Sequence, residues 1–365
     1  MLKTVRARIT TIAAVSLLLV GSFPAAALEW DLLDRPSRPS LHSLESVRTA
    51  VARAGSRLVS VGEAGIVLLS DDNGKTWHQA KVPVSVLLTN VFFRSPMLGW
   101  AVGHGGVVLT TQDAGETWTK QLDGKMAAQI ELEDAERAAA GSSTPALTHR
   151  LGEAKGLVTD GADKPFLGLY FFDDKRGMVV GAYGLAFTTD DGGQTWRSSI
   201  GNIENPKRRH LYAILPTENA VFIVGEEGDI YRSTDGGKSF AALAKASPGT
   251  LFGAAQAANG TIVVFGLRGN AYRSSDAGNS WQKIELPTSG LNAGIRLADG
   301  SLVLVDDWGE ILRSTDGGLS FKSAAPAQPM GLLGVVEAAD GSLALAGTAG
   351  NARIVLNGKS AEQTK

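Results

Sequence analysis

One eight-residue pattern recurs six times along the chain, and it constrains the fold more than any other feature of the sequence. The pattern is [ST]-x-D-x-G-x-[ST]-[WF], and its first copy occupies residues 70–77. Its aspartates are Asp72, Asp113, Asp191, Asp235, Asp276 and Asp316. Repetition of this kind indicates a chain built from copies of one supersecondary unit, stacked so that each unit buries the apolar face of the next.

A landmark glycine stands seven residues before each of these aspartates and makes the whole repeat unit visible. With the related Gly350, the landmark glycines are Gly65, Gly106, Gly184, Gly228, Gly269 and Gly309. They are about 41 residues apart, except between the second and the third, where residues 121–164 contain an insertion. We expect the first strand of each unit to begin eighteen residues before its landmark glycine, at Val47, Leu88, Phe166, His210, Leu251, Leu291 and Leu332.

Short apolar runs and glycine-rich turns fill each unit, and the chain contains 44 glycines among 365 residues. Units of about 40 residues with four short strands are typical of propeller blades. Helical solenoids need an apolar spacing of about 3.6 residues, which these units lack. We therefore predict an all-β fold, a seven-bladed β-propeller with Asp-box repeats, as the eight-residue pattern is called.

The two ends of the repeat array and the insertion lead to two further predictions. The seventh unit reaches Lys365 without a fourth strand, so we expect residues 28–32 to add this outer strand, with Trp30 in place of a box aromatic. Such closure by an N-terminal strand leaves no unpaired blade edge. The insertion, between blades two and three, is rich in Ala and Glu at residues 126–140 and 147–157. This composition predicts two short helices or a partly mobile excursion.

The N-terminus has the features of a secretory signal peptide. Lys3, Arg6 and Arg8 precede an apolar run at residues 9–20, and small residues follow at 25–27. We expect cleavage after Ala27, a single domain at residues 28–365 and a periplasmic location. An uncleaved anchor is the alternative, but the apolar run is shorter than the roughly 20 residues of a membrane span. No later segment is long and apolar enough to span a membrane.

Charge and cysteine content exclude several classes of function. The 35 basic and 37 acidic residues give a net charge of −2, which argues against nucleic-acid binding. The absence of Cys excludes disulfides, thiolate metal sites and a cysteine nucleophile. The five His are scattered singly, and the P-loop, serine-triad and zinc-hydrolase patterns are absent. We therefore expect no metal site and no cofactor.

The six box aspartates are predicted to be structural rather than catalytic, because one active site does not need six copies. In such a turn the Asp accepts backbone N–H bonds, the Gly permits a positive φ and the aromatic side chain packs between strands. Sialidases also carry Asp-boxes, so a sialidase-like glycoside hydrolase is the alternative, with a carboxylate pair among Glu63, Glu226, Glu227 and Asp307. The Arg-Ile-Pro-type motif that precedes the first box of sialidases is absent here. We expect a non-enzyme.

Residues that the repeat does not dictate are concentrated at one end of the predicted blades. Turns between second and third strands open there, as do the connections between blades and the insertion. Lys207 to Arg209 and His210 could equally be a solvated loop and a core histidine, and the exposed aromatics could pack on neighbouring loops. We predict partner binding by Lys207, Arg208, Arg209, His210, Tyr183, Arg268, Trp308, His104 and Glu226. A small molecule bound in the central channel is a further alternative.

The repeated turns and boxes together resemble the photosystem II stability and assembly factor family of Asp-box propellers. The resemblance rests on V-G-x-x-G turns at residues 61–65, 102–106 and 224–228, and on the segment Asp-Lys-Pro-Phe at residues 163–166. It implies a seven-bladed propeller that binds membrane-protein intermediates on the non-cytoplasmic side and catalyses nothing. Cyanobacterial members look lipid-anchored, whereas this chain has no Cys. The resemblance therefore implies a periplasmic relative in a non-photosynthetic bacterium, with a resistance-nodulation-division-type transporter as its client.

Overall fold

The computed structural model describes residues 31–356 except 143, 287 and 289. Its strands form seven antiparallel sheets, six of four strands and one of three. The all-β prediction is confirmed. The predicted signal peptide, its cleavage after Ala27 and Trp30 lie outside the described residues.

The sheets follow one another along the chain, and within each sheet consecutive strands are neighbours. The first two sheets comprise β1 (Arg48–Ala54), β2 (Arg57–Gly62), β3 (Val67–Ser70) and β4 (His78–Gln79), then β5 (Leu88–Phe93), β6 (Gly99–Gly103), β7 (Val108–Thr111) and β8 (Thr119–Leu122). The third and fourth comprise β9 (Phe166–Phe171), β10 (Gly177–Gly181), β11 (Ala186–Thr189) and β12 (Arg197–Ser198), then β13 (Leu211–Pro216), β14 (Val221–Gly225), β15 (Ile230–Ser233) and β16 (Ala241–Ala242).

The last three sheets repeat this arrangement. They comprise β17 (Leu251–Gln256), β18 (Ile262–Gly266), β19 (Ala271–Ser274) and β20 (Gln282–Lys283), then β21 (Leu291–Arg296), β22 (Leu302–Asp306), β23 (Ile311–Ser314) and β24 (Lys322–Ala325), and finally β25 (Leu332–Glu337), β26 (Leu343–Gly347) and β27 (Gly350–Ile354). The second strand of each sheet from β6 to β26 is buried along its length, as its apolar sequence demands.

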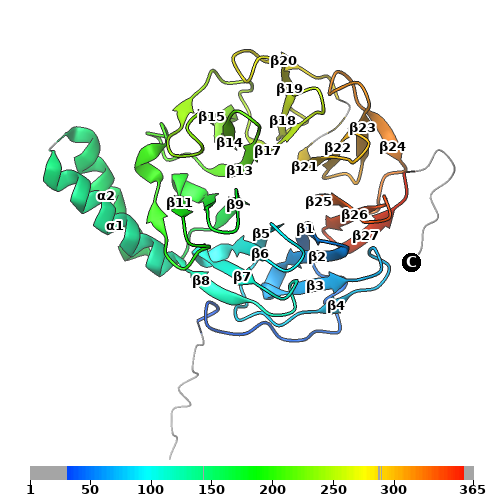
Figure 1. Ribbon diagram of the computed structural model, residues 1–365, viewed down its shortest axis with the longest axis horizontal. Coiled ribbons are helices and arrows are strands. Elements are labelled where there is room, and N and C mark those ends of the chain that lie inside the picture. Colours follow the sequence, from blue (N-terminus) through cyan, green and yellow to red (C-terminus); the bar gives the residue numbers. More distant parts are fainter. Residues whose placement is uncertain (1–30, 143, 287, 289, 357–365) are drawn as a thin grey trace, which may run out of the picture. The chain divides into compact units, whose positions relative to one another are not determined.

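The seven sheets surround a common centre, with the first strand of each sheet innermost (Figure 1). Each of these first strands packs against the first strand of the next sheet, and β25 packs against β1. The contact between the seventh and first sheets buries Val51, Leu58 and Ala344 in one apolar cluster. The arrangement is therefore propeller-like, and side-chain packing joins its first and last sheets.

The prediction that residues 28–32 add the outer strand of the seventh sheet is wrong for the part that the structure describes. In the described residues this sheet has three strands. A turn beside the first two sheets begins at Leu32, directly after Asp31. The Leu32 carbonyl accepts a hydrogen bond of 2.9 Å from the Ser85 N–H. The neighbouring Leu33 is 4% exposed and packs in the apolar cluster of those sheets. Burial of Leu33 fixes the segment there.

The insertion forms a helical hairpin between the second and third sheets, which is the first of the two predicted alternatives. Its helices are α1 (Gly124–Gly141) and α2 (Pro145–Asp160), which pack side by side (Figure 1). Asp123 caps α1 by accepting hydrogen bonds from two N–H groups of its first turn, and Pro145 opens α2, where a missing N–H costs nothing. A buried ion pair joins the helices, because Arg150 donates to the Glu131 carboxylate at 2.9 and 2.8 Å. Neither described helix meets the length and hydropathy of a membrane-crossing segment.

Two of the predicted strand starts are one residue too early. Leu211, not His210, pairs with the glycine that ends the second strand of the fourth sheet, and Arg48, not Val47, does so in the first. Arg48 is fully buried, and its guanidinium donates to the Ile66 carbonyl at 3.0 Å, where other sheets place Leu or Phe. The spacing to the landmark glycine differs by one residue in these two units, so a fixed repeat assigned them wrongly.

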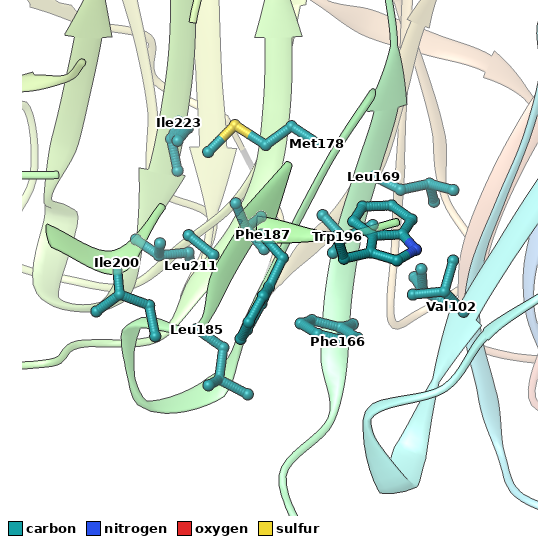
Figure 2. Close-up of a cluster of buried hydrophobic side chains, with 14 of the residues drawn as sticks. Val102, Phe166, Leu169, Met178, Leu185, Phe187, Trp196, Ile200, Leu211 and Ile223 are labelled. Atoms are coloured by element: carbon teal, nitrogen blue, oxygen red, sulfur yellow. The ribbon is translucent and has the colours of Figure 1, made fainter. Parts of the chain in front are cut away.

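The largest apolar cluster lies between the second, third and fourth sheets. Phe166, Phe187 and Trp196 of the third unit lie in it with Val102 of the second (Figure 2). Trp100 is fully buried there and stacks on Phe171, with ring centroids 3.5 Å apart and planes 7° from parallel. Aromatic side chains therefore contribute strongly to the packing of the second sheet against the third.

Candidate partner-binding face

The turns between second and third strands all lie at one end of the sheets, which we call the turn face. In a four-stranded antiparallel sheet, the Asp-box turn between the third and fourth strands lies at the opposite end. The connection to the next sheet returns to the turn face. This connection packs closely against the landmark glycine. A Cβ on Gly65 would lie 2.0 Å from the Val84 carbonyl oxygen, and a Cβ on Gly228 would lie 1.8 Å from the Ser247 carbonyl oxygen. This close approach of the backbone explains the landmark glycines.

The residue before the landmark glycine adopts a left-handed conformation in most of these turns. The φ angles are 54° at Ala64, 55° at Tyr183, 53° at Glu227 and 59° at Arg268, whereas the second sheet has a glycine at this place. A side chain in this conformation costs roughly 1 kcal/mol or more relative to glycine. Such strain is typical of functional sites, and three of these four side chains are large and polar.

Large exposed side chains occupy three of the turns. Trp308 is 66% exposed, Tyr183 55% and Leu267 41%. The turn of Trp308 is held by buried Asp306, which replaces the first glycine of the V-G-x-x-G pattern. Its carboxylate accepts hydrogen bonds from the N–H groups of Trp308 at 2.9 Å and Glu310 at 2.7 Å. The indole is therefore presented to solvent by a fixed turn.

The predicted basic run at residues 207–209 is largely neutralised within the chain. Arg208 pairs with Glu153 of α2 at 2.8 Å, and its side chain is 19% exposed. Arg209 pairs with Asp229 at 2.9 Å and also with Glu227, and its side chain is 15% exposed. Hydrogen bonding by Asp229 raises the pKa of Arg209 further. Lys207 alone of the run is exposed and makes no ion pair with a described residue.

A row of rings runs from the turn face toward the centre of the ring of sheets. The ring centroids of Tyr183 and His210 are 5.0 Å apart, those of His210 and Tyr212 are 6.3 Å apart, and those of Tyr212 and Phe252 are 5.3 Å apart. The Lys164 ammonium lies 5.2 Å from the centroid of Tyr183. The row places His210 on the turn face between two tyrosines.

The remaining predicted residues lie in three different turns. Glu226 accepts a hydrogen bond of 3.2 Å from the His210 N–H, so it helps to hold that residue. His104 and Arg268 are exposed. Arg268 makes no hydrogen bond or ion pair with any described residue, which leaves its guanidinium available to a partner.

Sequence reasoning missed two contributors to the turn face. Leu267 lies in a V-G-x-x-G-type turn but was not among the predicted contact residues, because a single exposed leucine is ordinary in a sequence. Lys164 lies at the end of the insertion, and its contact with Tyr183 joins residues from different elements. The first could have been found by comparing equivalent turns, whereas the second required the fold.

The box aspartates bond within their own turns. In the fourth box, Asp235 accepts hydrogen bonds from the Ser233 hydroxyl at 2.6 Å, the Ser239 N–H at 3.1 Å and the Ser239 hydroxyl at 2.6 Å. Similar bonds from a backbone N–H and hydroxyls lower the pKa of Asp72 to about 2. Among residues 31–356 as described, no three His, Asp or Glu side chains are grouped so that they could hold a metal ion.

Seven sheets, six boxes and a turn face define a class, that of Asp-box proteins with a propeller-like fold. A family model described as photosynthesis system II assembly factor YCF48 matches residues 157–329, and one described as BNR/Asp-box repeat matches residues 68–79. The predicted resemblance to this family is confirmed. Curated proteins include no match to the chain.

Solved structures show the same fold at low sequence identity. A structure titled "YCF48 bound to D1 peptide" has a TM-score of 0.61 and 14% identity, covering 84% of this chain and 92% of its own. YCF48 from Cyanidioschyzon merolae has a TM-score of 0.59 and 15% identity, covering 87% and 96%. A streptogramin B lyase has a TM-score of 0.64 and 13% identity, covering 88% and 97%. The fold is therefore shared by binding proteins and enzymes.

Proposed function

We propose that the chain is a seven-bladed Asp-box propeller that binds an envelope membrane protein and catalyses no reaction. The observation that carries the proposal is the presence of Trp308, Tyr183 and Leu267, which are 66%, 55% and 41% exposed, in equivalent turns of one face. Tyr and Trp are the residues that most often anchor protein interfaces. The family match and the peptide complex of a YCF48 protein support a protein partner.

The proposed location is the periplasm. The basic, apolar and small-residue regions at residues 1–27 support export by a cleavable signal peptide. A partner would then be a membrane protein with a segment exposed on the non-cytoplasmic side. The resemblance to the assembly factor family favours an inner-membrane transporter of the resistance-nodulation-division type as that client.

The proposed contact residues differ in what they contribute. Trp308, Tyr183, Arg268 and Lys207 are exposed and would touch the partner directly. His104 would border the contact from the second sheet. A second set would hold the turn face in shape through its internal bonds and comprises Arg208, Arg209, His210 and Glu226.

Replacement of Trp308 by Ala should weaken partner binding about 30-fold, because truncation of a central aromatic anchor costs about 2 kcal/mol. The matched control is Leu319→Ala, since Leu319 is 58% exposed in the Asp-box turn of the same sheet. Pull-down from detergent-solubilised envelopes, followed by titration of the purified partner, measures both variants. A photoreactive residue at position 308 should crosslink to the partner, and one at position 319 should not.

The proposed face would be wrong if Leu319→Ala released the partner while Trp308→Ala retained it. The proposed function itself would be wrong if neither position crosslinked to any membrane protein at equal expression. Melting curves of both variants show whether a loss of binding comes from unfolding.

Two substitutions of Arg268 should separate binding from strain. Both Arg268→Gly and Arg268→Ala remove the guanidinium, so both should weaken partner binding to the same degree. Because Arg268 has a φ of 59°, the glycine variant should be more stable than the alanine variant by about 1 kcal/mol. Urea unfolding measures this difference. Equal stability of the two variants would contradict the strain argument, and unequal binding would contradict a direct role of the guanidinium.

A glycoside hydrolase is the enzymatic alternative, favoured by carboxylates on the turn face. Glu226 is half-buried there, and the structure titled "Crystal structure of AFV00434, an ancestral GH74 enzyme" shares the fold with a TM-score of 0.61 and 11% identity. Turnover of a glycoside panel that is lost in Glu226→Gln or Asp307→Asn would replace the proposed function by this one. Absence of turnover with intact partner binding is the expected result.

A further inference from the structure

The first strand of every sheet carries a bulge at its second residue. In all seven sheets the pairing of the first strand with the second skips this residue. The skipped residues are Thr49, Thr89, Leu167, Tyr212, Phe252, Asn292 and Leu333. Bulges re-aim side chains and are common beside functional sites.

These seven side chains line one cavity at the centre of the ring of sheets. The cavity has a volume of about 410 Å³, and every bulge residue lies in its wall. Each bulge residue is the second residue of a strand that begins at the turn face. The seven bulge residues therefore form a layer just inside the cavity opening on this face. The 18 described residues of the wall include no charged side chain. A charged ligand would find no counter-ion here and would lose hydration.

The layer has an aromatic side and a hydroxyl side. Tyr212 and Phe252 come from neighbouring sheets, the fourth and fifth, and their rings meet at 74°. Thr49 and Thr89 come from the first and second sheets, on the other side of the ring (Figure 1). A ligand in the cavity would therefore have an apolar face against the rings and a polar edge against the threonines.

Most polar side chains of the layer already use a donor group in a hydrogen bond, so their oxygens remain as acceptors for a ligand. Thr49 and Thr89 donate their hydroxyl protons to the Leu88 and Phe166 carbonyls, both at 2.6 Å. Asn292 donates from its amide to the Leu332 carbonyl at 2.8 Å. The hydroxyl of half-buried Tyr212 makes no hydrogen bond with a described residue. The wall is matched to a neutral ligand that brings its own hydrogen-bond donors.

We propose that this cavity binds a neutral sugar of one or two rings. A pyranose has an apolar face that fits the rings of Tyr212 and Phe252, and its hydroxyl groups donate to the oxygens of Thr49, Thr89 and Tyr212. The wall has no carboxylate to act as acid or nucleophile, so the sugar is bound and not cleaved. The site is independent of the proposed membrane-protein partner.

The test is saturation-transfer NMR on the full chain with glucose, N-acetylglucosamine and maltose as probes. At least one neutral sugar should give a saturable signal, and glucuronate should bind at least tenfold more weakly. Tyr212→Phe should lower the affinity for the sugar about fivefold, which corresponds to the loss of one neutral hydrogen bond. Phe252→Leu should weaken it by a similar factor or more through loss of the ring.

The matched control is Tyr272→Phe, a tyrosine of β19 that does not line the cavity. It should leave sugar binding unchanged. The proposal is overturned if none of the three sugars saturates, if glucuronate binds equally well, or if Tyr212→Phe and Tyr272→Phe behave alike. Tyr212→Phe removes only the hydroxyl oxygen and should fold normally. It therefore tests the sugar site even if Phe252→Leu fails to fold. Partner capture plays no part in these readouts, so either proposal can fail without the other.

Discussion

Replacement of Trp100 by Ala should lower the free energy of unfolding by about 4 kcal/mol, within the range measured for large aromatic truncations in cores. Trp100 is fully buried, stacks on Phe171 of the next sheet and donates from its indole N–H to the Gly192 carbonyl at 3.3 Å. The variant leaves a cavity between the second and third sheets and removes the indole hydrogen bond, while the Gly192 carbonyl keeps its hydrogen bond from the Gln121 side chain. Urea unfolding followed by circular dichroism measures the loss.

The control for this prediction is the same substitution at an exposed position. Trp308→Ala removes an indole that is 66% exposed, so it should change the free energy of unfolding by less than about 0.5 kcal/mol. Equal losses for the two variants would mean that burial of Trp100 between the second and third sheets adds no stability beyond that of an exposed indole. A loss confined to one segment would show that neighbouring sheets unfold separately.

The melting temperature should fall steeply between about pH 4 and pH 2, because box aspartates lose their charge in that window. Hydrogen bonds from the hydroxyl and N–H of the closing Ser or Thr lower the pKa of Asp191, Asp276 and Asp316 to about 2, and the N–H of Thr76 does the same for Asp72. A pKa that is lower in the folded state gives stability that is complete above the unfolded value near 3.8 and disappears as the pH falls to the folded value. Protonation thus favours unfolding.

A double variant, Asp72→Asn with Asp276→Asn, tests the origin of this acid sensitivity. It should be less stable than the wild type at neutral pH and show a smaller fall in melting temperature between about pH 4 and pH 2. Asp173 and Asp340, with pKa values also lowered to about 2, keep part of the slope. The control Glu136→Gln removes an exposed carboxylate without a described ion pair and should leave the slope unchanged. An unchanged slope in the double variant would place the acid sensitivity elsewhere.

The sequence by itself determined the repeated parts of this protein. Each Asp-box closes with bonds between residues at most four apart, such as those from Thr76 to Asp72 at 2.9 and 2.7 Å. Landmark glycines recur at a fixed spacing from each box, and the composition of the insertion is typical of helices. These patterns are visible in the residues themselves, so the seven units and five of the seven first-strand starts could be predicted, with helices as one of two alternatives for the insertion.

The tertiary structure alone decided which predicted site residues are available to a partner. Arg208 belongs to a basic run in the sequence, but its partner Glu153 lies 55 residues away on α2. Residues 31–33 lie beside the first two sheets, where Leu33 is buried in their apolar cluster. Bulges shift the register of the first strands, so the ring of side chains around Tyr212 is invisible to a fixed repeat. Local hydrogen bonds are encoded by neighbouring residues, whereas charge pairing and channel lining arise only when distant segments meet.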